Sequence, residues 1–180
     1  IDAACWAVFR EGYRSGFGAD GDHLKTMEDI KSAVETGVRM ITLDISEQLR
    51  GEAFDMERED LEALYEEMFD EDEREALSSE YENNEFFIQL NGDKQALKFL
   101  HKNVMRNAVC YYRGIECAAE VYHYLSNAIE EKIDFEVSID EVGFPTKPKS
   151  HYFVANELDK RMVKADSLAP CFVGEFQKAV

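Results

Sequence analysis

The chain has 180 residues and carries 38 Asp and Glu against 20 Lys and Arg, a formal net charge of −18. It has no concentrated basic patch for phosphate contacts, which argues against nucleic acid as a partner. It also has no apolar run approaching the roughly 20 residues that span a bilayer, which argues against a membrane partner.

Most of the net charge belongs to one stretch of the chain. Residues 52–85 contain sixteen acidic residues and two arginines, so they carry −14 and the remaining 146 residues only −4. The length suits one domain with a sizeable core but is short for a closed (β/α)8 barrel of about 250 residues. Because the chain begins at Ile1 and stops at Val180 without a turn or helix cap, we expect an internal segment of a longer protein.

The cysteines are scattered without a CxxC pair, and no signal-peptide pattern precedes them. This usage favours free thiols in a reducing cytoplasm over a disulfide framework. None of them has an evident base partner in the sequence, so we do not expect a nucleophilic thiol. The four are Cys5, Cys110, Cys117 and Cys171.

The first 50 residues alternate strand and helix signals. A glycine-rich run follows an expected first strand and leads into Asp20. A Thr-x-x-Asp capping box then opens a helix over residues 27–36, which Gly37 ends. The β-branched run at residues 38–44 predicts a strand with Asp44 at its C-terminal end. Strand, helix, glycine and strand in this order indicate a βαβ unit with a right-handed crossover.

The acidic segment, residues 51–92, has helical spacing of its apolar residues, as at Leu61 and Tyr65. We expect a solvated helical insertion outside the strand core, because sixteen carboxylates cannot be buried unpaired. A docking surface for a basic partner is the alternative. A calcium site is not expected, since the EF-hand pattern of glycine and ligands is absent.

The remainder of the chain continues the alternation. Apolar stripes predict helices over residues 96–112 and 115–125. Strands are expected over residues 133–140 and 163–169, with a helix over residues 149–161 between them. The strand runs are apolar rather than strictly alternating, as in strands buried on both faces. The sequence therefore predicts an α/β fold: a partial TIM-like (β/α) barrel with parallel strands, which residues 1–180 form as one segment.

Ligands of parallel α/β proteins collect at the C-terminal ends of strands. The residues expected there are Asp20, Asp22, His23, Asp44, Asp140, Glu141, Ser167 and Pro170. One histidine with several carboxylates suits a hydroxylated substrate held through a divalent cation, which could be zinc, nickel, iron or manganese. A carboxylate beside such a cation can also move a proton at a carbon next to an oxygen.

Each of these residues also has an ordinary interpretation. Asp22 and His23 could form a simple loop turn, and Glu141 could be a charged loop residue. His151 could cap or pack at the start of a helix. The two mid-helix histidines, His101 and His123, are expected to be structural or on the surface. The glycines near the start do not spell GxGxxG, so no nucleotide cradle is expected.

Several segments resemble the tagaturonate/fructuronate epimerase family of hexuronate catabolism. They are GFGADGDHLKT at residues 16–26, MITLD at 40–44, FEVSIDE at 135–141, PTKP at 145–148, HYFVANEL at 151–158 and SLAPCFVGEFQK at 167–178. The resemblance implies a barrel-like fold, a divalent metal and epimerisation of a keto-hexuronate.

By the same resemblance, Asp22 is the proton acceptor, His23 a metal ligand and Glu141 the proton donor, with Asp44 and His151 as expected substrate-binding residues. The family pattern continues past the end of this chain into further metal-binding histidines, so the metal site here is expected to be incomplete. Two departures, Val142-Gly143 and Cys171, stand where more polar or basic residues are usual. Both bear on recognition of the substrate carboxylate.

Three functions remain open at this point. The favoured one is a metal-dependent sugar-acid epimerase whose substrate is a small molecule and whose other partner is the rest of the same protein or a second copy. The alternatives are another metal-assisted barrel enzyme, such as an aldolase or ketose isomerase, and a non-catalytic module built on the acidic segment. Both enzyme hypotheses require Asp22, His23 and Glu141 to converge in one pocket.

Overall fold

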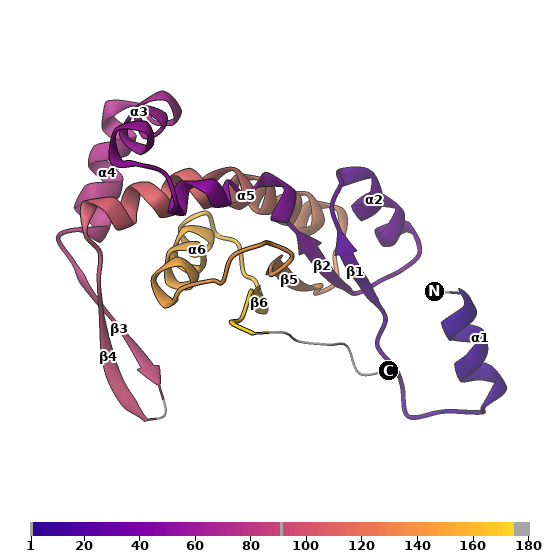
Figure 1. The fold of residues 1–180 in the computed structure, drawn as a ribbon. Coiled ribbons are helices and arrows are strands. Elements are labelled where there is room, and N and C mark those ends of the chain that lie inside the picture. The colour runs from indigo at the N-terminus through magenta and orange to yellow at the C-terminus, as the bar shows by residue number, and fades with distance from the viewer. Residues whose placement is uncertain (1, 91, 175–180) are drawn as a thin grey trace.

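The computed structural model describes residues 2–90 and 92–174. The last four residues of the SLAPCFVGEFQK segment, 175–178, lie outside this range. In chain order the elements are α1 (Asp2–Arg10), β1 (Asp20–Leu24), α2 (Met27–Glu35), β2 (Met40–Asp44), η1 (Ser46–Gln48), η2 (Gly51–Phe54), α3 (Arg58–Met68), α4 (Glu71–Tyr81), β3 (Glu85–Leu90), β4 (Asp93–Lys98), α5 (His101–Ala128), β5 (Asp134–Ile139), α6 (Pro148–Lys160) and β6 (Ser167–Pro170) (Figure 1). Among these, no helix is both long and apolar enough to cross a membrane.

A four-stranded parallel sheet with the order β1-β2-β5-β6 is the centre of the fold. The predicted parallel strands at residues 38–44, 133–140 and 163–169 are confirmed, although the last begins only at Ser167. The helices predicted over residues 27–36 and 149–161 are also confirmed as α2 and α6. The chain thus has a mixed α/β fold with one parallel sheet, and the closed barrel stays a prediction.

Local chemistry explains why α2 forms where it does. The Thr26 hydroxyl accepts the N–H of Asp29 at 3.1 Å, and the Asp29 carboxylate accepts the N–H of Thr26 at 3.3 Å. This reciprocal capping box satisfies two donors that the first turn leaves free. At the other end Gly37 has φ +83°, a left-handed conformation that glycine adopts without steric cost.

The expected first strand before Asp20 is wrong. Residues 2–10 form α1 instead, and Asp20, Asp22 and His23 belong to the strand β1 itself. The parallel pairing with β2 is regular at Asp20 and Gly21 and resumes at Leu24, with an irregularity in between. Asp22 and His23 therefore occupy a bulge, a feature that redirects side chains within a strand.

The two faces of the sheet differ in polarity, although most positions of β2 and β5 are buried, as expected for strands covered on both faces. The Thr42 hydroxyl donates to Asp20 Oδ2 at 3.0 Å and approaches Glu136 Oε1 at 3.3 Å, while the Ser167 hydroxyl donates to Glu136. These polar residues come from all four strands and form one row. The alternate positions, including Ile41 and Phe135, are fully buried. Period-two alternation therefore gives the sheet one polar and one apolar face.

The long helix α5 covers part of the apolar face. Tyr122 packs against Phe135 of β5, with ring centroids 5.5 Å apart. Near the middle of α5, Gly114 lies against Ile45 just after β2, where an added Cβ would come within 2.8 Å of the Ile45 side chain. The close approach of helix and sheet therefore depends on this glycine.

The predicted helix over residues 96–112 is wrong at its start. Residues 93–98 form β4, which pairs with β3 in an antiparallel hairpin that projects from the body (Figure 1). Gly92 lies at φ +88°, a conformation that hairpin turns require. The helix α5 begins at His101 and continues without a break to Ala128, through both predicted apolar stripes.

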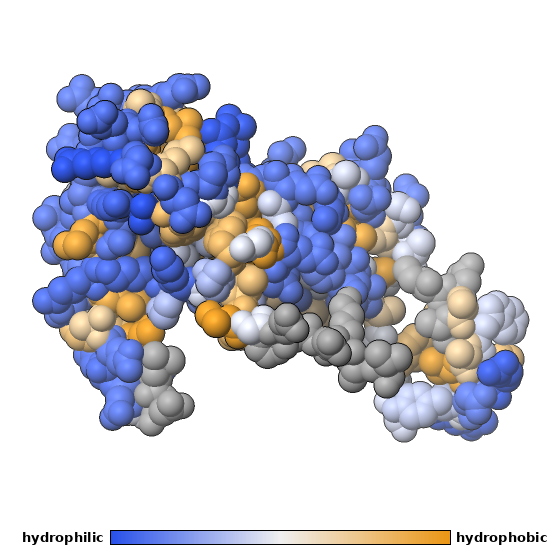
Figure 2. All heavy atoms as spheres, viewed as in Figure 1, coloured by the Kyte–Doolittle hydropathy of each residue, from blue (hydrophilic) through white to orange (hydrophobic). Residues whose placement is uncertain are grey.

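The acidic segment forms helices outside the sheet, as expected, although its last residues enter the strand β3. Leu61 and Tyr65 of α3 and Leu77 and Tyr81 of α4 are buried. The charged faces of α3 and α4 dominate the hydrophilic surface at the upper left of Figure 2. The helices of the acidic segment therefore bury an apolar stripe and leave their carboxylates in water.

Candidate functional site

Three predicted residues from three different elements converge at the C-terminal edge of the sheet. His23 Nδ1 lies 3.5 Å from Asp44 Oδ2 and 3.6 Å from Glu141 Oε1. Each residue offers one possible ligand atom, and these three atoms all lie within 4.8 Å of one another. Within the described residues this is the one group of three or more histidines, cysteines and carboxylates spaced for a metal ion.

Asp44 is positioned by β2, whose last residue it is. Its side chain is completely buried, and Oδ1 accepts the backbone N–H of Ser46 at 2.8 Å. Burial favours the neutral acid, but hydrogen bonds from Ser46 and Lys25 outweigh it and lower the pKa of Asp44 to about 2. The site thus contains a buried carboxylate that is ionised at neutral pH.

His23 is positioned by the bulge in β1. Its φ of 51° is unusual for a residue with a Cβ, so the backbone is strained where it presents the imidazole. Its Nδ1 is buried without a hydrogen-bond partner, whereas Asp44 Oδ2 opposite it is ion-paired with Lys25 Nζ at 3.2 Å. Buried polar atoms are almost always paired, and each exception needs an explanation. Nδ1 and Oδ2 face each other 3.5 Å apart, a spacing that fits a cation bound by both atoms.

Lys25 is a member of the cluster that the sequence did not reveal. Its Nζ lies 3.2 Å from Asp44 Oδ2 and 3.5 Å from both Glu141 Oε2 and Glu47 Oε1. The hydrogen bond to Asp44 is the largest of the effects that raise the pKa of Lys25. The available signal was its place two residues after His23, the spacing that puts strand side chains on one face.

The other residues expected at this edge differ in whether they lie near His23. Asp22 Oδ1 lies 3.7 Å from His23 Nε2, on the nitrogen opposite the one that faces Asp44. Asp140 is turned back to accept the Ser138 hydroxyl. His151 lies in the first turn of α6, and its nitrogens are not among the described contacts of His23, Asp44 or Glu141. A substrate-binding role for His151 stays a prediction.

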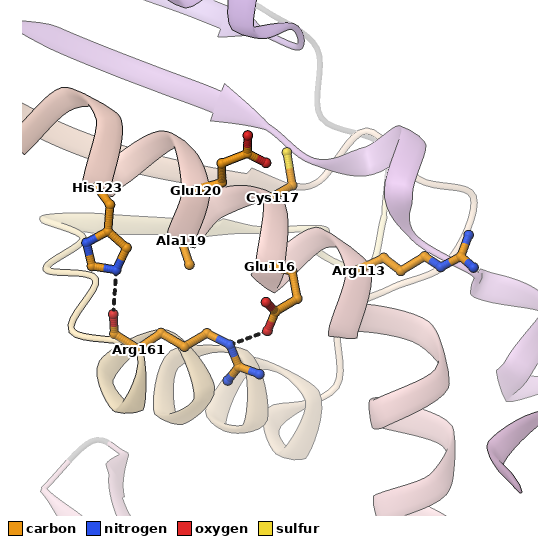
Figure 3. Close-up of a pocket in the computed structure, with 7 residues that line it drawn as sticks. All are labelled: Arg113, Glu116, Cys117, Ala119, Glu120, His123 and Arg161. Carbon is orange, nitrogen blue, oxygen red and sulfur yellow. Dashed lines mark hydrogen bonds and ion pairs between the residues drawn. The ribbon is translucent and has the colours of Figure 1, made fainter. Parts of the chain in front are cut away.

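Both histidines that were expected in mid-helix have structural partners, although His101 is the first residue of α5 and only His123 lies within the helix. His101 Nδ1 lies 2.8 Å from Glu82 Oε1. His123 Nε2 lies 3.1 Å from the backbone oxygen of Arg161 in a groove of about 620 Å³ between α5 and the end of α6 (Figure 3). In the same groove Arg161 Nε pairs with Glu116 Oε1 at 2.6 Å. The polar groups of this groove join two helices, so it is not the candidate site.

The chain was compared with protein families, curated proteins and solved structures. The family model UxaE, described as tagaturonate epimerase, matches residues 1–180. A protein of Thermotoga maritima named tagaturonate/fructuronate epimerase is 37% identical over the whole chain, which spans 36% of that protein. The chain thus has about a third of the length of this curated relative.

The solved structures that match come from Cohnella laeviribosi. The native structure of its fructuronate-tagaturonate epimerase UxaE superposes with a TM-score of 0.87, and a complex with one glycerol with 0.88. Each is 41% identical, and the match covers 98% of this chain and 35% of the solved chain. The arrangement of strands and helices described above is therefore also found in an experimental structure.

Proposed function

Because the chain belongs to the tagaturonate epimerase family, we propose that it is part of a metal-dependent epimerase acting on a keto-hexuronate, of the type that interconverts tagaturonate and fructuronate. One observation carries this proposal beyond family membership. His23, Asp44 and Glu141 converge at the sheet edge, and the buried His23 Nδ1 that faces both carboxylates lacks a hydrogen-bond partner.

The residues present fit a divalent cation. Imidazole nitrogen and carboxylate oxygen are the ligands that zinc, nickel, iron and manganese accept. A bound cation would polarise an oxygen of the substrate and so make the neighbouring carbon more reactive. Catalytic sites typically use three protein ligands and an open position, so His23 and Asp44 would be joined by at least one further ligand from the rest of the protein, which leaves Glu141 free for proton transfer.

The carboxylates on the two sides of His23 suit the two proton transfers of an epimerase. In this proposal Asp22, beside Nε2, accepts a proton at its carboxylate, and Glu141, beside Nδ1, donates one. Lys25 Nζ lies 3.5 Å from Glu141 Oε2, so its positive charge would stabilise the carboxylate that remains after the proton is donated. Buried Asp44 holds the imidazole and the ammonium in place.

The wider setting follows from the same proposal. The polar face of the sheet would line the inside of a (β/α) barrel completed by the remaining part of the protein or by a second copy. The enzyme would work in the cytoplasm, where reducing conditions keep its cysteines as thiols, as they are among the described residues.

An assay of the full-length protein tests the proposal. The protein is stripped with a chelator, supplied separately with zinc, nickel, iron or manganese, and incubated with tagaturonate. Formation of fructuronate that depends on one of these ions is the expected result. An aldolase would release shorter carbon fragments, which chromatography separates from either hexuronate. Full turnover in the stripped protein would contradict metal dependence, and fragments as the main product would contradict epimerisation.

A further inference from the structure

A cavity of about 380 Å³ shares no residue with the sheet-edge cluster of His23, Asp44 and Glu141. It is lined by Phe54, Leu97, Asn103, Arg106, Asn107, Lys147, Pro148, Lys149 and Ser150. These residues come from η2, β4, α5 and the start of α6. Its volume is at the lower end of the range for small-molecule pockets, about 300–1,000 Å³.

The charge of this cavity is opposite to that of the chain. Arg106, Lys147 and Lys149 line it, and none of the lining residues is acidic, although the chain has a net charge of −18. Within the described part of the chain, no carboxylate lies within 4.0 Å of these three cations. Lys149 Nζ contacts Asn103 Oδ1 at 3.0 Å, which leaves its charge uncompensated.

The first turn of α6 adds backbone donors to the cavity. This helix has 13 residues, and no side chain caps its start. Pro148 contributes no N–H, so the N–H groups of Lys149 and Ser150 are the free donors of this turn. A helix N-terminus carries a partial positive charge and favours an anion.

Two buried atoms point to a ligand. Asn107 is only 2% exposed; its Nδ2 donates to the Asn103 carbonyl at 2.6 Å, but its Oδ1 has no hydrogen-bond partner. Arg106 Nε, in the same cavity, is buried without an acceptor. The unpaired Oδ1 can accept from a donor and the unpaired Nε can donate to an acceptor, and a ligand with a hydroxyl and an anionic oxygen offers both.

We propose that this cavity binds a small hydroxylated oxyanion, either a phosphate that carries a hydroxyl or a hydroxy acid. The anionic oxygens contact Arg106, Lys147, Lys149 and the first turn of α6, and the hydroxyl donates to Asn107 Oδ1. The two sources share this chemistry and differ in the anionic group.

Calorimetric titration of the full-length protein tests the proposal. The His23→Ala protein is used, so that binding at the sheet-edge cluster does not contribute and the outcome does not depend on the epimerase assignment. Sodium phosphate and sodium gluconate are titrated separately at low ionic strength. Saturable binding of phosphate alone identifies a phosphate site, and saturable binding of gluconate alone a hydroxy-acid site. Absence of saturable binding for both overturns the proposal.

Variants locate the binding. Arg106→Gln and Lys147→Gln should each weaken binding roughly tenfold or more, because each removes a charge-assisted hydrogen bond. Lys147 is exposed, so its variant reports on binding even if Arg106→Gln unfolds. Lys102→Gln is the matched control: this exposed lysine lies on α5 but does not line the cavity. An equal loss of affinity in Lys102→Gln would mean general attraction to charge and would overturn the proposal.

Discussion

Two buried carboxylates in this chain have opposite surroundings. Glu157, in α6, is 3% exposed, and both of its oxygens are paired: Oε1 accepts Tyr81 Oη at 2.7 Å and Lys160 Nζ at 3.0 Å, and Oε2 accepts Arg161 at 2.6 Å. Asp44, in β2, is 1% exposed; its Oδ1 accepts the Ser46 N–H, and its Oδ2 lies 3.2 Å from Lys25 Nζ and faces His23 Nδ1, which has no hydrogen-bond partner.

The difference separates a carboxylate that holds the fold from one that is held ready for a ligand. A satisfied network such as that of Glu157 rigidifies the contact between helices. An unpaired buried polar atom costs roughly 1–3 kcal/mol, and the fold has one at His23 Nδ1, opposite Asp44, which the strand, Ser46 and Lys25 fix in place. Loss of Glu157 should therefore reduce stability, and changes around Asp44 should reduce metal binding and turnover.

The largest effect is expected from His23→Ala in the full-length protein. Loss of the imidazole removes a ligand, so the bound ion and about 10³-fold or more of the turnover should disappear together, since a metal contributes several kcal/mol to catalysis. Metal content by mass spectrometry and initial rates measure both. His123→Ala, which changes a histidine bonded to the Arg161 backbone, should keep the ion. A His23→Ala protein that retains its metal ion and its turnover rate would contradict a ligand-binding role for the cluster around Asp44.

Glu157→Ala should act on stability instead. It leaves Tyr81 and Arg161 without their buried acceptor, and breaking such a pair costs about 3 kcal/mol. Urea unfolding measures the loss, and metal content per folded protein should not change. Glu116→Ala removes the other, half-exposed partner of Arg161 and should cost less than about 1 kcal/mol. Equal losses in the two variants would show that burial does not distinguish them.

Glu141→Gln separates proton transfer from metal binding within the cluster. The amide keeps an oxygen but cannot donate the catalytic proton, so the ion should stay while turnover falls about 10²-fold. Glu47→Gln is the control, because Glu47 also contacts Lys25 but not His23. An unchanged rate in Glu141→Gln would remove the assigned role.

The smallest effect concerns pH. The pKa of Asp44 falls from 3.8 to about 2 on folding, so its ionised form stabilises the protein above pH 4. This contribution, about 2 kcal/mol, should be lost as the pH falls from 4 to 2. Urea unfolding of metal-free wild type and Asp44→Asn across this range measures it as a difference between the two curves. Parallel curves would contradict a lowered pKa.

The sequence predicted the parts of the fold that local chemistry determines. The capping box at Thr26, the stop at Gly37 and the β-branched strand before Asp44 predicted the helix and the second strand of the βαβ unit correctly, while its first strand was misplaced. The hairpin was missed because Ala96 and Leu97 continue the apolar spacing of α5, so strand and helix patterns overlap. Pairing with β3, a tertiary contact, decided between them.

The sequence predicted where the site lies but not how its side chains are oriented. The rule of strand ends brought together Asp44 and Glu141, which are distant in sequence but share the partner His23. The bulge that turns His23 inward left no pattern in the sequence, because it arises from the register with β2. Lys25, two residues after His23, could have been predicted from strand alternation but was missed.

The strand order also determines when this protein can complete its sheet. The central strands β2 and β5 are neighbours although bonded residues such as Thr42 and Glu136 are 94 positions apart. Long loops close slowly, so β1, α2 and β2 should form a local unit well before β5 joins it. During synthesis one edge of β2 is therefore unpaired while the acidic segment and α5 are being made. In a pulse-labelled hydrogen-exchange experiment, the backbone amides of β1 should become protected before those of β5. The negative charge of the acidic segment, which is made in that interval, should repel other copies of the incompletely folded chain and so oppose aggregation.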